Sequence, residues 1–172
     1  MIRELLAREV RTCVYASDRS GTDEALALAR DAGADALASG ADAAGFVRER
    51  EMSDWLARRY ADGAAVGVLV TTDASGPKVA AGESSARARA LVHYDFPRDA
   101  NAYRARVAGA FADDDSDEDG LERVDADDST RRIVIGLVAG AGEARRLREI
   151  ADALRLDISE LPLDAIQRMR AR

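Results

Sequence analysis

The sequence predicts an α/β fold, in which helices cover both faces of an open, mostly parallel sheet. Short apolar runs rich in β-branched residues, such as Val66–Val70 and Leu91–Val92, lead into polar residues, as buried parallel strands do. These runs alternate with segments whose apolar residues recur at helical spacing, and this alternation is typical of parallel sheets. The length of 172 residues suits a single domain over residues 1–172.

The expected elements follow from apolar period and from turn residues. Strands are expected at Thr12–Ala16, Ala34–Ala38, Val66–Asp73, Leu91–Asp95 and Arg132–Val138. Helices are expected over residues 1–9, 23–32, 46–61, 99–111 and 143–156. The second helix places Ala25, Leu28 and Ala29 on one face, with Ser20 or Thr22 as its cap and Gly33 as its left-handed closing residue. The third helix has Phe46, Trp55 and Tyr60 among its buried stripe.

Two aspartates stand where two expected strands end. Asp73 follows Val68-Leu-Val-Thr-Thr, and Asp95 follows Leu91-Val-His-Tyr. Open α/β sheets bind ligands at the carboxyl ends of their strands. Asp73 and Asp95 are therefore the first candidates for function.

Several chemistries are excluded by what the sequence lacks. No glycine-rich phosphate loop of the form GxxxxGK[ST] occurs, and no GxSxG elbow. The single cysteine, Cys13, falls in an expected strand and is interpreted as a buried, inert thiol. The single histidine, His93, is interpreted as a core residue rather than a general base, and with so few ligands a zinc site is not credible.

Charge is concentrated in one segment. Residues 113–128 hold ten acidic residues against one arginine, a net charge of −9, so the rest of the chain carries +2 of the total of −7. Within this insertion, Asp115, Asp117 and Asp119 precede Gly120, as in the opening of a calcium loop, but the twelfth position is Ala126 instead of glutamate. A solvated acidic loop is therefore favoured over a calcium site.

The motifs resemble those of one family. Val14–Glu24, Val68–Asp73 and Leu91–Tyr103 look like successive motifs of the second RecA-like domain of DEAD-box RNA helicases, in order and in approximate spacing, over roughly residues 5–160. The ending, Glu143–Ile150 with Leu161-Pro162, resembles the last helix of that domain. The resemblance implies a RecA-like fold.

The resemblance also implies roles for individual residues. Arg19 matches an arginine on the RNA side of the domain, and Arg48 matches an arginine that contacts RNA phosphates, although the glutamine before it is replaced by Gly45. Thr72 matches a threonine near RNA, and Asp73 matches an aspartate that contacts the ribose of the nucleotide. Directly after Asp73 the match is interrupted, because Ala74–Glu83 replaces the family's ARGxD, and it resumes at Leu91.

The family's HRxGRxxR element is mostly lost. Aligned from Tyr103, only Arg106 remains as a remnant of the nucleotide contact, and the two arginine-finger positions are Gly109 and Ala112. The 172 residues also contain no first RecA-like domain with its phosphate loop. The resemblance therefore implies that this chain is not an enzyme by itself and needs no cofactor.

The favoured hypothesis is a non-catalytic, degenerate helicase-type domain that acts as a binding or scaffolding module for RNA or for a protein partner. The alternative is the carboxyl-terminal half of a split ATP-dependent RNA helicase, which docks on a separate ATPase subunit. The third hypothesis is that the chain is a structural relic that binds no ligand. The charged beginning and the lack of a long apolar run predict a cytoplasmic chain without membrane contact.

A basic rim is one further candidate surface. Arg19, Arg48, Arg87, Arg89 and Arg106, together with Thr72, would form it. Such side chains suffice for phosphate contacts, but no aromatic residues stand among them to stack bases. Weak, salt-sensitive and sequence-independent RNA binding is expected.

Overall fold

The computed structural model describes residues 10–39, 67–77, 86, 88–111 and 132–160. Within these ranges the strands are β1 (Thr12–Ala16), β2 (Asp35–Ala38), β3 (Gly67–Thr72), β4 (Ala90–His93) and β5 (Ile133–Gly136). The helices are α2 (Arg19–Asp31), α4 (Ala100–Ala110) and α5 (Ala141–Leu154). All five strands run parallel in one sheet, in the order β2-β3-β1-β4-β5. The predicted open, parallel α/β sheet is confirmed.

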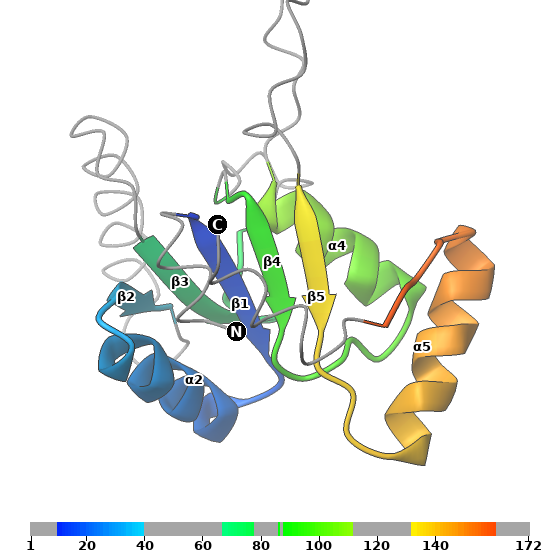
Figure 1. The fold of residues 1–172 in the computed structure, drawn as a ribbon, viewed down its shortest axis with the longest axis horizontal. Coiled ribbons are helices and arrows are strands. Elements are labelled where there is room, and N and C mark those ends of the chain that lie inside the picture. Colours follow the sequence, from blue (N-terminus) through cyan, green and yellow to red (C-terminus); the bar gives the residue numbers. More distant parts are fainter. Residues whose placement is uncertain (1–9, 40–66, 78–85, 87, 112–131, 161–172) are drawn as a thin grey trace, which may run out of the picture.

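Helices cover both faces of this sheet (Figure 1). On one face α2 packs Ala25 and Ala29 against Val14, Val70 and Val92. On the other, residues of α4 and Phe111 pack against Cys13, Leu69 and Leu91. Alternate residues along each strand point to opposite faces, so the apolar runs fill both cores. Figure 1 shows α5 standing beyond the outer strand β5.

The start of α2 differs from the prediction. The helix begins at Arg19, and its cap is Asp18, whose carboxylate accepts a hydrogen bond from the Gly21 N–H at 2.9 Å. Ser20 and Thr22 lie inside the helix, where the Thr22 hydroxyl donates to the Asp18 carbonyl at 2.8 Å. The free N–H in the first turn therefore donates to the carboxylate of Asp18, whereas the prediction had a Ser or Thr hydroxyl accept this hydrogen bond. The closing residue is as predicted, because Gly33 has φ +88°.

The single cysteine and the single histidine of the chain are both buried, as predicted. Cys13 is fully buried, and burial raises the pKa of its thiol to about 12, so it stays protonated and unreactive. His93 is a core residue of β4. No helix in the described part of the chain is long and apolar enough to cross a membrane.

Several predictions lie outside the described residues. These are the helices over residues 1–9 and 46–61, Arg48, Arg87, Ala112 and the acidic insertion with Asp115, Asp117 and Asp119. Among the residues that are described, no cluster of histidine, cysteine and carboxylate side chains could hold a metal ion.

Candidate functional site

The carboxyl ends of β1, β3 and β4 lie side by side at one edge of the sheet. Ala16 of β1 is in register with Thr72 of β3, and Tyr15 is in register with His93 of β4. Asp73 follows directly after β3, and Asp95 lies two residues beyond β4. Both aspartates therefore reach the edge where the sequence placed them.

Asp73 forms a bidentate pair with Arg106 of α4. The Arg106 Nε donates to Asp73 Oδ1 at 2.6 Å, and Nη2 donates to Oδ2 at 2.9 Å. The arginine side chain is 1% exposed, whereas the aspartate side chain is 46% exposed. A buried guanidinium needs such a partner, because an unpaired charge in the protein interior is strongly unfavourable. The pair therefore fastens α4 to the end of β3.

The third side of the Arg106 guanidinium is also engaged. Its Nη1 donates to the carbonyl of Asp95 at 2.7 Å, and its carbon lies 5.2 Å from the centre of the Tyr15 ring. The carboxylate of Asp95 accepts from the Ser17 N–H at 2.7 Å. One arginine thus joins β3, the end of β4 and α4, with β1 beneath it.

Tyr15 fills the space where two glycines approach each other. A Cβ added to Gly109 would lie 2.6 Å from the Tyr15 hydroxyl and 2.7 Å from the Pro77 carbonyl oxygen. A Cβ added to Gly76 would also lie 2.6 Å from that hydroxyl. Neither position can carry a side chain without movement of its neighbours. The turn after β3, Tyr15 and α4 are therefore in direct contact.

A cluster of hydroxyl groups ties the end of β2 to the end of β3. Ser39 Oγ and Thr71 Oγ1 are 2.6 Å apart, and Thr72 Oγ1 lies 2.8 Å from Ser75 Oγ. Ser75 Oγ also donates to the Ser39 carbonyl at 3.0 Å. Ser75 belongs to the stretch after Asp73 where the family match is interrupted. It holds Thr72 in place through its own hydroxyl.

His93 lies directly behind this edge. Its ring is 5.8 Å from that of Phe96 and 5.3 Å from that of Tyr103, measured between centroids. Both ring nitrogens are buried and have no hydrogen-bond partner among the described residues. Burial, and next the charge of Arg106, lower the pKa of His93 to about 3. The imidazole is therefore neutral at pH 7 and is no candidate for a general base.

Comparison with solved structures decides the fold. The carboxyl-terminal domain of Saccharomyces cerevisiae Dbp5, bound to Gle1 and IP6, superimposes with a TM-score of 0.67 and 13% identity, over 99% of this chain and 88% of that one. A DEAD box protein from Methanococcus jannaschii gives 0.59 and 18%, over 94% of this chain and 39% of the other. The carboxyl-terminal part of the Fun30 ATPase domain gives 0.57 and 9%, over 94% and 43%.

The chain has the fold of a carboxyl-terminal RecA-like domain. The prediction of this fold is confirmed by the parallel sheet and by the three superpositions. Neither a protein-family model nor a curated protein matches the sequence. The chain spans about two fifths of the length of the DEAD box protein from M. jannaschii.

The carboxyl edge of the sheet brings together Arg19 and Thr72, two of the residues assigned to RNA. Arg19 is the first residue of α2 and lies three residues beyond Ala16, the register partner of Thr72. Its guanidinium is exposed and lies 3.7 Å from the Asp23 carboxylate, one turn along α2. Thr72 is half-buried. Arg19, Thr72 and Asp73 therefore share one edge.

The predicted basic rim needs a correction. Arg89 directly precedes β4, and its N–H donates to the Arg11 carbonyl at 2.9 Å, before the start of β1. It therefore lies at the amino-terminal edge of the RecA-like sheet, opposite Arg19 and Thr72. Arg106 is buried and adds no exposed charge to the rim. In a parallel sheet, residues before a strand and residues after a strand lie at opposite edges.

Three residues of the site were missed by the sequence reasoning. Tyr15 was assigned only to a strand, and Ser75 and Gly76 only to the stretch that departs from the family. A tyrosine inside a buried strand was the one available signal, because a buried tyrosine usually needs a place for its hydroxyl. No local pattern predicts that Gly76 and Gly109, far apart in the sequence, would flank it.

Proposed function

We propose that this chain is a non-catalytic, degenerate helicase-type domain that acts as a binding or scaffolding module for RNA or for a protein partner. The pairing of Arg106 with Asp73 is the observation that carries the proposal. Both groups were assigned to the nucleotide, but the guanidinium is 1% exposed and donates two hydrogen bonds to the carboxylate. A phosphate could reach this arginine only by displacing a charge-assisted pair.

The packing around Gly109 supports the same proposal. The finger position holds Gly109, and a Cβ added there would lie 2.6 Å from the Tyr15 hydroxyl and 2.7 Å from the Pro77 carbonyl oxygen. An arginine there would need space that the turn after β3 already fills. Phosphoryl transfer depends on positioned cations around the phosphates, and this position supplies none.

A domain of this fold that lacks catalytic groups still has surfaces that bind a partner. The similar Dbp5 domain is solved in complex with Gle1, a protein. The described edge carries exposed Arg19 and the half-buried Thr72 hydroxyl, which suit phosphate contacts. Fold analogy alone does not choose between protein and RNA.

The alternative is the carboxyl-terminal half of a split helicase. One observation favours it: the Asp73 side chain is 46% exposed at the sheet edge, so a ribose hydroxyl could share its carboxylate with Arg106. In that case a separate subunit with a phosphate loop would supply the rest of the ATPase site.

A steady-state ATPase assay separates the two functions. The purified chain is expected to show no ATP hydrolysis, with or without RNA, and an isothermal titration is expected to show no ATP binding tighter than about 1 mM. Hydrolysis by the isolated chain would contradict the module. Hydrolysis that appears only with a copurified subunit, and that is lost in an Asp73→Asn variant that remains folded and still binds that subunit, would establish the split helicase.

A further inference from the structure

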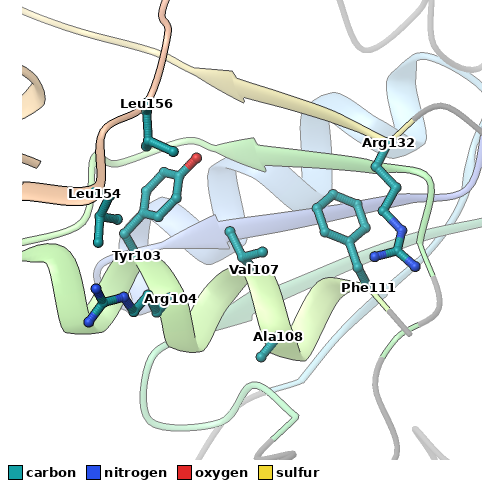
Figure 2. Close-up of a pocket in the computed structure, with 8 residues that line it drawn as sticks. All are labelled: Tyr103, Arg104, Val107, Ala108, Phe111, Arg132, Leu154 and Leu156. Atoms are coloured by element: carbon teal, nitrogen blue, oxygen red, sulfur yellow. The ribbon is translucent and has the colours of Figure 1, made fainter. Parts of the chain in front are cut away.

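A groove lies between α4 and the chain that leaves α5 (Figure 2). Tyr103, Val107, Ala108 and Phe111 form one wall, and Leu154 and Leu156 form part of the other. The groove is open to solvent and has a volume of about 370 Å³. This volume is near the lower end for sites that take a small ligand or a few side chains, about 300–1,000 Å³.

The fold builds the apolar lining from regular features. Tyr103, Val107 and Phe111 follow one another at intervals of four residues, so they form one stripe on α4. Arg155 ends α5 in the left-handed conformation, with φ +53°, and the Leu156 N–H donates to the Ala151 carbonyl at 2.9 Å. This turn places Leu154 and Leu156, on either side of it, in the same lining.

Two arginines stand at the ends of the groove. Figure 2 shows Arg104 at one end of the lining and Arg132 at the other, with Val107 between them. Both arginines are exposed. The Arg132 guanidinium lies 5.7 Å from the centre of the Phe111 ring, which holds the charge beside the apolar surface.

Apolar surface continues from the groove onto β5. Val134 is the register partner of Leu91, so both side chains lie on the face of the sheet that α4 covers. Leu91 is buried, whereas Val134 is 40% exposed. An exposed β-branched residue next to an apolar groove extends the surface that a partner could cover.

We propose that this groove docks an acidic segment of a partner protein. One or two bulky apolar side chains of the segment fill the groove, and carboxylates beside them pair with Arg104 and Arg132. Burial of the apolar side chains supplies the affinity, and the two guanidinium groups select acidic sequences over neutral or basic ones. This inference rests on the proposed binding module and names its surface and the chemistry of its partner.

The lining favours a protein segment over RNA. A nucleic acid presents one charge at each nucleotide and is held by rows of cations, whereas this groove has an apolar floor between two separate cations. Sequence-tolerant RNA binding also needs aromatic faces open to bases. Phe111 is buried, and Tyr103 is half-buried.

The test selects binders without assuming their sequence. A phage-displayed library of random peptides is panned against the full chain, and the strongest binder is synthesised and titrated by fluorescence anisotropy. The expected binders contain bulky apolar residues next to aspartate or glutamate. Enrichment of basic peptides, of peptides without carboxylates, or of none at all overturns the proposal.

Matched variants locate the binding. Ala108→Trp, which fills the groove from an exposed position, and Arg104→Glu are each expected to weaken the synthetic peptide about tenfold. Arg30→Glu makes the same charge reversal on α2, which packs on the other face of the sheet, and is expected to change affinity less than twofold. Equal binding by wild type, Ala108→Trp and Arg104→Glu overturns the proposal. Arg104 is exposed, so its variant tests the groove even where Ala108→Trp does not fold.

Other occupants give different results. Single-stranded RNA that displaces the peptide and is itself weakened by Ala108→Trp would make the groove an RNA site and overturn the proposal. A synthetic peptide of residues 113–128 that binds the variant lacking this segment, and that Ala108→Trp weakens, would identify this chain's own acidic insertion as the occupant and also overturn the proposal. The proposed function is tested separately from the groove. If a native protein binds the wild type and Ala108→Trp equally well, the chain is still a binding module, but its partner does not use the groove.

Discussion

Arg106 donates two hydrogen bonds to the carboxylate of Asp73, at 2.6 and 2.9 Å, across the gap between α4 and the end of β3. The same guanidinium donates to the Asp95 carbonyl, so its three outward directions are all used inside the domain. Two residues that the sequence assigned to a nucleotide thus hold the sheet edge together. Their contribution to stability can be measured apart from any ligand.

Asp73→Ala should destabilise the fold by about 3 kcal/mol. The substitution leaves the buried Arg106 charge without its partner, and breaking a buried pair costs about 3–5 kcal/mol. The lower end applies because the aspartate side is half open to water. The free energy of urea unfolding measures this change. Arg98→Ala removes the exposed pair with Asp99, whose side chains are 84% and 51% exposed, and should change the free energy of unfolding far less, because solvent screens this pair. Equal effects of the two substitutions would contradict a structural role for the buried pair.

Gly109→Ala should destabilise α4 although alanine is the better helix former. The gain in helix propensity is about 1 kcal/mol, whereas overpacking a close contact costs about 1–3 kcal/mol or more. The added Cβ would meet the Tyr15 hydroxyl at 2.6 Å and the Pro77 carbonyl oxygen at 2.7 Å. The midpoint of urea unfolding should therefore fall.

Gly142→Ala on α5 is the matched control. No atom lies within 4 Å of its added Cβ, so this substitution should raise stability by up to about 1 kcal/mol. Tyr15→Phe combined with Gly109→Ala should recover part of the loss, because one of the two contacts disappears. Gly109→Arg should neither pack well nor give ATPase activity. A stable Gly109→Ala variant would show that the turn after β3 can move away from α4.

The fold was predictable because it depends on patterns that extend along the chain. Apolar runs, helical spacing and Gly33 locate the sheet and the three helices of the described residues to within a few residues, since each reflects a local requirement for burial or for a left-handed residue. The cap of α2 was misassigned because Asp18, Ser20 and Thr22 are all good caps, and only the path of the chain decides which carboxylate or hydroxyl reaches the free N–H.

The sequence predicted where the site lies in the fold, but not which of its residues contact one another. A strand that ends in aspartate places Asp73 at the edge, yet nothing in the spacing of Asp73 and Arg106 indicates that they pair. That contact depends on how α4 crosses the sheet. The groove was not predicted either, because it needs the left-handed Arg155 to bring Leu154 and Leu156 opposite α4. Contacts between distant segments are set by packing, which one sequence does not display.

Stability should decrease between pH 7 and pH 5 because of His93. Its pKa is about 3 in the folded domain and about 6.5 in the unfolded chain, so the unfolded state binds the extra proton in this window. The stabilisation is complete above pH 6.5 and is lost as the pH falls toward 3. At pH 5 the loss should be about 2 kcal/mol. Urea unfolding at a series of pH values measures it.

The assignment to His93 can be checked because the chain has only this histidine. His93→Leu should remove the slope between pH 7 and pH 5, whatever its effect on stability at pH 7. The charged groups that act on the imidazole are Arg106, which opposes protonation, and Asp73, which favours it. Asp73→Ala should therefore not raise the pKa of His93. A slope that persists in His93→Leu would place its origin elsewhere.

Deletion of residues 113–128 should strengthen RNA binding at low salt. The deletion removes a net charge of −9 and changes the total from −7 to +2, so repulsion of the phosphate backbone falls. Titration of labelled single-stranded RNA at about 50 mM and 200 mM salt measures the effect, which should shrink at the higher salt. A variant with the acidic residues of this insertion replaced by serine should behave like the deletion if charge is responsible.

Arg19→Glu, at the exposed start of α2 beside Thr72, should weaken the RNA binding that the deletion reveals. If the deletion leaves the affinity for RNA at low salt unchanged, the insertion is not an electrostatic screen. If Arg19→Glu leaves it unchanged, RNA does not bind at the carboxyl edge of the sheet.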